Sequence, residues 1–257
     1  MCGHATGTLD ELAEAAAGRG LDEVGIADHM PLLYCEDPEL AMAVEELPLY
    51  VERVLELKER FRDRITVRLG IEADYHPGTQ DERRRMIEAH PWDYVIGSVH
   101  ILDGWVFDDP RRLEGYEGLD LDDFFTRYLR TVGEMARTGL YNTIGHADLA
   151  KKFGHRAGID LTEIYREVLE EIQAAGMCYE INTAGLRWPA DEMYPDPGFV
   201  RLGAELGVPV TLGSDAHSPS DVGRDFDRAL ALLRRAGYRE MAFFEGGRMI
   251  LRSLPER

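Results

Sequence analysis

Polar side chains of the kinds that bind metal ions recur in this sequence directly after short apolar runs. These side chains are His29 ("GIADH"), Glu72 ("RLGIEAD"), His100 ("IGSVH"), His146 ("TIGH"), Asn182 ("EIN"), and Asp215 with His217 ("TLGSDAH"). Histidine and carboxylate ligands without thiolates are typical of catalytic zinc, iron or manganese sites. A single histidine at such a position is usually an ordinary polar residue, but four of them with Glu72 and Asp215 predict bound metal. With His4 as a further candidate, the ligands exceed what one ion takes, which indicates two or three ions.

The elements that must hold these side chains alternate between strands and helices. The β-rich runs cover residues 23–28, 65–75, 93–100, 141–148, 178–182, 208–217 and 241–246, and amphipathic segments separate them. A capping box formed by Thr8 and Glu11 predicts the start of the first helix. The clearest helix follows Asp160, its expected N-cap, and stops at Gly176. This alternation predicts a parallel sheet.

The positions of the polar residues distinguish two arrangements of such a sheet. In a barrel, the carboxyl ends of many strands meet at one mouth. An open doubly wound sheet instead concentrates its ligands at one switch point. Six of the runs end in polar groups here, so the sequence predicts an α/β barrel with its site at the carboxyl ends of the strands.

Composition limits the class of protein. The 257 residues are 44% hydrophobic, enough for one large core, so we expect a single domain. The formal net charge of −19 argues against binding to nucleic acid or to an anionic membrane surface. The three scattered cysteines include no Cys-x-x-Cys pair, and the sequence shows neither a signal peptide nor an apolar membrane span. We therefore expect a cytoplasmic protein.

Several strings, in this order, resemble the histidinol-phosphate phosphatases of the polymerase and histidinol phosphatase (PHP) superfamily. They are "CGHATGT", "GIEADYHPG", "DYVIGSVH", "IGHADLAKKFG", "INTAGLR" and "LGSDAH", and the match runs from Cys2 to about Gly223. The resemblance implies a distorted (β/α)7 TIM-like barrel that holds a cluster of three divalent ions, which would be zinc, iron or manganese. It also implies an enzyme that hydrolyses L-histidinol phosphate to L-histidinol and phosphate in histidine biosynthesis.

Carried over motif by motif, the resemblance also implies ligands for each ion. One ion would be held by His4, His29 and His217, a second by Glu72, His100 and His146, and the third by Asp215 with a bridging Glu72. The resemblance thereby also implies Asp215 and Glu72 as the catalytic residues. Lys152 in "DLAKKFG" and Arg187 in "NTAGLRWP" are candidates for binding the phosphate, although an ordinary surface cation is an equal alternative for Lys152.

The resemblance further implies a first strand with a His-x-His pair before the Cys-x-His loop, whereas this chain begins at Met1, one residue before Cys2. Because the other ligands are all retained, we expect a start assigned too far downstream rather than a real loss. Residues 1–257 would then form a single PHP-type metal-dependent phosphatase domain that lacks its first strand.

Three hypotheses for function follow from the sequence. The first is a histidinol phosphatase, the second is a PHP-type phosphoesterase or nuclease on another substrate, and the third is a catalytically impaired PHP-like binding protein. Only the missing pair supports the third. The expected partner is a small phosphorylated substrate, with no nucleic acid and no membrane, and the expected assembly is a monomer or a small homo-oligomer.

Overall fold

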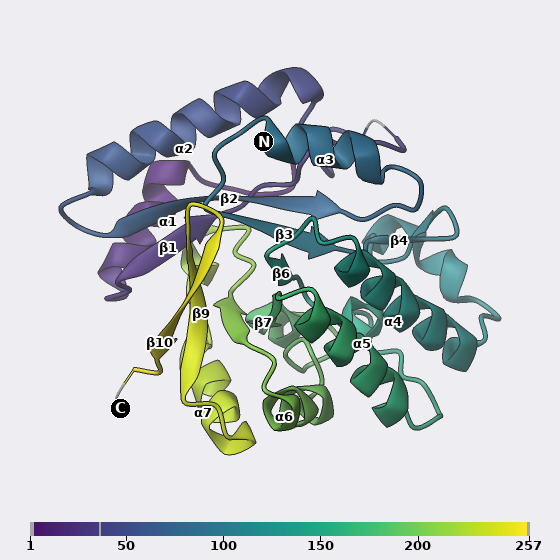
Figure 1. The fold of residues 1–257 in the computed structure, drawn as a ribbon. Coiled ribbons are helices and arrows are strands. Elements are labelled where there is room, and N and C mark those ends of the chain that lie inside the picture. The colour runs from purple at the N-terminus through teal and green to yellow at the C-terminus, as the bar shows by residue number, and fades with distance from the viewer. Residues whose placement is uncertain (1–2, 36, 256–257) are drawn as a thin grey trace.

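Six parallel strands form one curled sheet in the order β1-β2-β3-β6-β7-β8 (Figure 1). They are β1 (Glu23–Ile26), β2 (Thr66–Asp74), β3 (Tyr94–Ser98), β6 (Thr143–Ile144), β7 (Cys178–Asn182) and β8 (Val210–Gly213). The computed structural model describes residues 3–35 and 37–255, so Cys2 lies outside it. The predicted barrel-type α/β fold is confirmed. Within the described residues its parallel sheet has six strands rather than the implied seven, with β1 and β8 at its edges.

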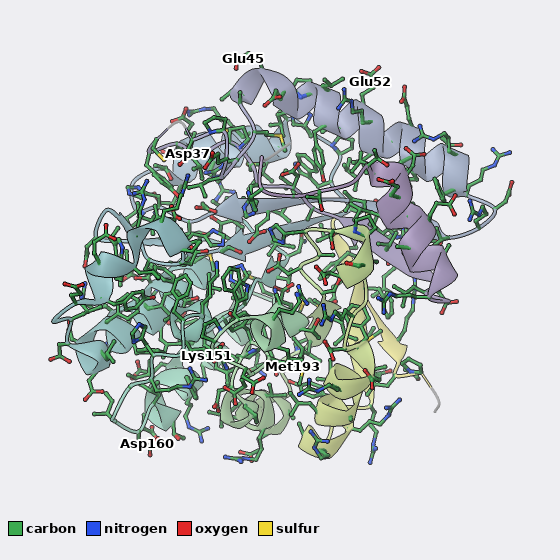
Figure 2. The ribbon with its side chains drawn as sticks, turned by 180° about the vertical axis from the view of Figure 1, so that it is seen from behind. Asp37, Glu45, Glu52, Lys151, Asp160 and Met193 are labelled. Atoms are coloured by element: carbon green, nitrogen blue, oxygen red, sulfur yellow. The ribbon has the colours of Figure 1, made fainter. Side chains whose placement is uncertain are left out.

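Helices surround this sheet (Figure 1). They are α1 (Leu9–Gly18), α2 (Leu47–Phe61), α3 (Gln80–Glu88), α4 (Leu121–Arg137), α5 (Thr162–Ala174), α6 (Pro197–Leu206) and α7 (Phe226–Ala236). The carboxylates of Glu45 and Glu52, before and within α2, point away from the body of the molecule (Figure 2). None of the helices in the described ranges is both long and apolar enough to cross a membrane.

Local signals in the sequence explain where two of these helices begin. At α1, the Thr8 side chain accepts the N–H of Glu11, and the Glu11 carboxylate accepts the N–H of Thr8, which confirms the capping box. At α5, Leu161 is the N-cap and the prediction of Asp160 was wrong by one residue. Asp160 still stabilises this helix, because its carboxylate accepts the N–H of Thr162 at 2.9 Å.

Two antiparallel hairpins stand outside the parallel sheet. The predicted strand near residues 241–246 is β9 (Glu240–Glu245), and it pairs with β10 (Arg248–Ser253) instead of extending the parallel sheet. The reason is the turn Gly246-Gly247, in which both residues have positive φ, as a two-residue hairpin requires. The smaller hairpin joins β4 (Ile101–Leu102) to β5 (Trp105–Val106).

An aromatic side chain packs inside the barrel near the amino ends of its strands. The ring of Tyr94, the first residue of β3, lies over Gly25 and Gly70, where any Cβ would overlap it. The same ring stacks on Phe244 of β9, with 5.7 Å between the ring centroids. Tyr94 and Phe244 thus fill part of the interior near the amino ends of these strands.

Candidate metal centre

Neighbouring strands bring three of the predicted ligands together. Glu72 lies near the carboxyl end of β2, while His100 and His146 each follow the last residue of β3 or β6 by two positions. Strand pairing fixes this arrangement, because Glu72 is in register with Ile96 of β3, and Gly97 of β3 is in register with Ile144 of β6. The three side chains therefore come from adjacent strands at one end of the sheet.

We call Glu72, His100 and His146 the inner group. Nε2 of His146 lies 3.1 Å from Oε1 of Glu72 and 3.3 Å from Nε2 of His100. Nε2 of His100 is 3.6 Å from the same carboxylate oxygen. Three potential ligand atoms thus surround one point, and the residues that carry them are buried or half-buried.

We call His4, His29 and His217 the outer group. The ring of His4 lies 5.3 Å from that of His29 and 4.7 Å from that of His217, measured between centroids. Two contacts hold the loop that carries His4. Nδ1 of His4 is 2.5 Å from the carbonyl oxygen of Glu39, and the N–H of Thr6 donates to the carbonyl of His217 at 2.8 Å. The arrangement leaves one ligand atom of each histidine close to the others.

Glu72 connects the inner group to the outer group. Its Oε1 faces the other two residues of the inner group, whereas its Oε2 is 3.8 Å from Nδ1 of His29 in the outer group. Its backbone is fixed by two further hydrogen bonds, from its own N–H to the carbonyl of Asp28 and from the N–H of Met30 to its carbonyl. One carboxylate is therefore held so that each oxygen faces a different group of histidines.

Asp215 lies beside these groups, after β8. Oδ2 of Asp215 accepts from the Asn182 amide at 3.3 Å, and Oδ1 is 3.5 Å from Nδ1 of His217. The backbone of Asp215 has a φ of 47°, a conformation uncommon for a residue with a side chain. Such local strain is found most often where function fixes the position of a side chain.

The charges of the site are strongly coupled. Burial raises the pKa of Glu72, but the nearby imidazoles of His29, His146 and His100 outweigh it and hold this pKa well below its usual value. Burial lowers the pKa of His100, but the carboxylates of Asp74 and Asp108 outweigh it and raise this pKa to about 10. The carboxylates are therefore charged at neutral pH and attract cations to the mouth of the barrel.

The donor set fits divalent metal ions. In each group, one potential ligand atom of each residue lies close to those of the other two, as the ligands of a common ion do. At the inner group two imidazole Nε2 atoms face each other at 3.3 Å, where a bound cation can accept both lone pairs. The His-and-carboxylate composition suits zinc, iron or manganese.

The two predicted phosphate-binding cations lie near the centre but already have partners. Nζ of Lys152 donates to the carbonyl and carboxylate of Asp108 at 2.7 and 3.1 Å, and lies 4.5 Å from the centroid of the Trp188 ring. Nη2 of Arg187 donates to the carbonyls of Ser214 and Asp215. Nη1 of Arg187 is buried and has no hydrogen-bond partner within the described residues, so it can donate to a ligand oxygen.

Sequence reasoning missed two carboxylates of the site. Asp74 follows Glu72 by two residues on β2 and forms a third possible metal-binding group with His29 and His100. The two-residue period of a strand, which puts both side chains on one face, was an available signal. Asp108 lies in an irregular segment, and no sequence pattern indicated it.

A cavity of about 930 Å³ extends along the interior from β1 to β8. Its lining includes His29, Glu72, His146, Asp215 and His217, so both groups border the same space. This volume is within the range of pockets that hold small molecules.

The chain resembles known proteins along almost all of its length. The model of the PHP domain family matches residues 1–184. A protein of Deinococcus radiodurans named "Probable histidinol-phosphatase" is 43% identical over 244 residues, which cover 95% of this chain and 93% of that protein. The histidinol-phosphatase of Bacillus subtilis is 28% identical over 262 residues, covering 90% of this chain and 95% of that protein.

A solved structure shows the same fold. The histidinol phosphate phosphatase of Lactococcus lactis superposes with a TM-score of 0.82 at 24% identity, over 96% of this chain and 94% of that one. That crystal structure contains zinc, L-histidinol and phosphate.

Proposed function

This chain belongs to the PHP domain family, and from that premise we propose that it is a metal-dependent histidinol-phosphatase, which hydrolyses L-histidinol phosphate to L-histidinol and phosphate. The observation that carries the proposal is the convergence of the inner and outer groups on one cavity at the carboxyl ends of the strands. The match to the Deinococcus radiodurans protein, which is 43% identical over 95% of this chain, supports this substrate.

We assign the metal ligands as His4, His29, Glu72, His100, His146, Asp215 and His217, around a cluster of up to three divalent ions. Such ions neutralise charge on a phosphoryl group and lower the pKa of a coordinated water. Glu72 suits a bridging role because each of its oxygens faces a different group. Asp215 is oriented by the Asn182 amide beside His217, which suits a ligand at the mouth of the cavity.

Arg187 and Lys152 are assigned to the substrate phosphate. The support for Arg187 is its unpartnered Nη1, held beside the Ser214–Asp215 backbone by the hydrogen bonds of Nη2. The support for Lys152 is weaker, because Asp108 already neutralises its charge. Lys152 therefore needs to exchange this partner for the phosphate when substrate binds.

The proposal extends to the context of the enzyme. The main hydrophobic core contains buried residues from Ala13 to Leu233, which suits one domain over residues 1–257. We propose that the protein acts in the cytoplasm on a small phosphorylated substrate, as a monomer or a small homo-oligomer and without a nucleic-acid or membrane partner.

Substrate selectivity tests this proposal. The zinc- or manganese-loaded protein is assayed for phosphate release from histidinol phosphate, p-nitrophenyl phosphate and a dinucleotide. We expect turnover of histidinol phosphate to exceed the others by at least about a hundredfold, because polar groups placed for one substrate reject substrates that leave them unpaired. His90→Ala is the matched control, since His90 precedes β3 and lies at the opposite end of that strand from His100.

The other outcomes identify the alternatives. Equal turnover of the three substrates would favour a PHP-type phosphoesterase or nuclease of different specificity. Tight metal binding without turnover of any of them would favour an impaired PHP-like binding protein.

A further inference from the structure

A chain of hydrogen bonds leads from the loop after β1 to the inner group. The hydroxyl of Tyr34 donates to Oδ2 of Asp74 at 2.7 Å. The other oxygen of Asp74, Oδ1, lies 2.8 Å from Nδ1 of His100. Asp74 is only 3% exposed, so water does not compete effectively for either oxygen.

The contact with Asp74 determines which nitrogen of His100 can bind metal. A carboxylate only accepts hydrogen bonds, so Nδ1 of His100 carries the proton. Nε2 of the neutral ring then presents its lone pair toward Glu72 and His146, from which it is separated by 3.6 and 3.3 Å. A carboxylate on the distal nitrogen of a ligand histidine fixes both the tautomer and the ring orientation.

Tyr34 restricts what Asp74 can do. His29, Asp74 and His100 are close enough to form a metal-binding group by themselves. The Tyr34 hydroxyl donates to Oδ2 and His100 contacts Oδ1, so each oxygen of Asp74 already has a hydrogen-bond partner. The hydroxyl thereby favours an orienting role for Asp74 over a coordinating one.

The loop that carries Tyr34 is itself anchored to the segment after β2. The Tyr34 ring stacks on His76 with 5.1 Å between centroids. Nη1 of Arg83 in α3 donates to the carbonyl of Pro31 at 3.0 Å, and Arg83 is only 1% exposed. The hydroxyl is therefore held in place from two directions.

We propose that Tyr34 is a positioning residue for metal binding, which acts through Asp74 to orient His100. The inference rests on the proposed metal-dependent function. It assigns to Tyr34 an effect on the affinity of one ion in the inner group, and no contact with substrate.

Metal affinity of four variants tests the proposal. Tyr34→Phe removes one hydroxyl, Asp74→Asn removes the charge, and a third variant combines both. Tyr238→Phe is the matched control, because its hydroxyl bonds to Tyr179 and to the carbonyl of Val208, away from the metal centre. Zinc affinity of each metal-free protein is measured by competition with a chelator, and cobalt absorption spectra report the coordination of each site.

We expect Tyr34→Phe to lower the affinity for one zinc ion by about tenfold. This is the lower end of the effect of residues that support a metal ligand without binding the metal themselves. Excess zinc should restore kcat with KM unchanged, and Tyr238→Phe should bind zinc normally. The double variant should be no weaker than Asp74→Asn alone, because Tyr34 acts through Asp74.

The proposal would be overturned by normal zinc affinity in Tyr34→Phe, by equal weakening in Tyr238→Phe, or by additive losses in the double variant. A lower zinc stoichiometry of Asp74→Asn even at saturating zinc would do the same, since Asp74 would then be a ligand. If zinc binding depends on Tyr34 as expected but histidinol phosphate is not hydrolysed, the positioning role stands and the proposed substrate is wrong.

Discussion

The inner and outer groups hold similar ligands in very different surroundings. Glu72 and His146 of the inner group are 9% and 4% exposed, and they follow directly from paired strands. In the outer group the His217 side chain is 41% exposed and His4 lies on a loop near the start of the chain. The inner group is positioned by the sheet, whereas the outer group depends on contacts between loops.

The difference has a consequence for metal binding. Ligands that strand pairing and burial already hold in place lose little conformational freedom when an ion binds. Loop ligands must be ordered at the same time, and ordering each residue costs about 1–2 kcal/mol. We therefore expect the inner group to bind its ion more tightly and to contribute more to catalysis than the outer group.

Removing a ligand of the inner group should have the largest effect. For His146→Ala and for His100→Ala we expect loss of one ion and a fall in kcat of about a thousandfold or more, since metal ions contribute several kcal/mol to transition-state stabilisation. Metal analysis and phosphate release measure both effects, and circular dichroism checks that the fold is intact. Full activity in either variant would contradict the assignment of the inner group.

Proton competition should separate the two groups by pH. Burial lowers the pKa of His100, but the carboxylates of Asp74 and Asp108 outweigh it and raise this pKa to about 10. In the outer group, burial lowers the pKa of His4. A metal ion must displace the proton held by His100, so affinity at the inner group should rise by about tenfold per pH unit below that pKa. Because the pKa of the outer ligand His4 is lowered instead, protons compete less with a metal ion there, and we expect a weaker dependence of affinity on pH.

Chelator competition at about pH 6.5 and about pH 8.5 measures this contrast. His217→Ala isolates the inner group, and His146→Ala isolates the outer group. Equal pH dependence of zinc affinity in the two variants would show that protons do not distinguish the groups.

Removing a ligand of the outer group should have a smaller effect that added metal reverses. For His217→Ala we expect zinc affinity at one site to fall by about tenfold or more. This is at least the loss caused by removing a residue that only hydrogen-bonds to a metal ligand. Saturating zinc should restore most of kcat, because the inner group, which includes Glu72, remains intact. A loss of kcat that excess zinc does not restore would place His217 on a par with His146.

The apolar runs of the sequence indicated each residue of the inner group as a candidate ligand, whereas only the resemblance assigned the three to one ion. His29 and His217 of the outer group follow apolar runs as well, whereas His4 was indicated only by its motif, since no strand precedes it in the described residues. Strand-helix alternation likewise predicted the parallel sheet. It did not separate β9 from that sheet, although Gly246-Gly247 indicated a hairpin.

Asp108 and Tyr34 could not be predicted for a physical reason. Each lies in an irregular segment, and its partner is distant in the sequence: Lys152 for Asp108, and Asp74 for Tyr34. Such contacts depend on how loops fold over the mouth of the barrel, and no local periodicity records that. Asp74 is different, because its place two residues after Glu72 puts both on one face of β2.

The smallest expected effect tests the loop contacts of the outer group. Arg111 forms ion pairs with Asp37, Glu39 and Asp109, and the carbonyl of Glu39 is the partner of Nδ1 of His4. Asp37 is on the exposed loop near the edge of the molecule (Figure 2). Removing the positive charge of Arg111 should therefore loosen the loop that orients His4.

For Arg111→Gln we expect zinc affinity at the outer group to fall by about fivefold or less, since the ion pair with Glu39, the residue whose carbonyl contacts His4, is exposed, and exposed ion pairs contribute about 0–1 kcal/mol. The inner group should bind zinc as before, because it does not depend on this loop. Arg127→Gln is the matched control, since Arg127 pairs with Asp103 and Asp123 instead. The measurement is zinc titration at low and high salt. Because salt screens exposed charges, the difference in zinc affinity between Arg111→Gln and the unaltered protein should shrink at high salt. A difference that salt does not change would mean that Arg111 acts through packing rather than charge.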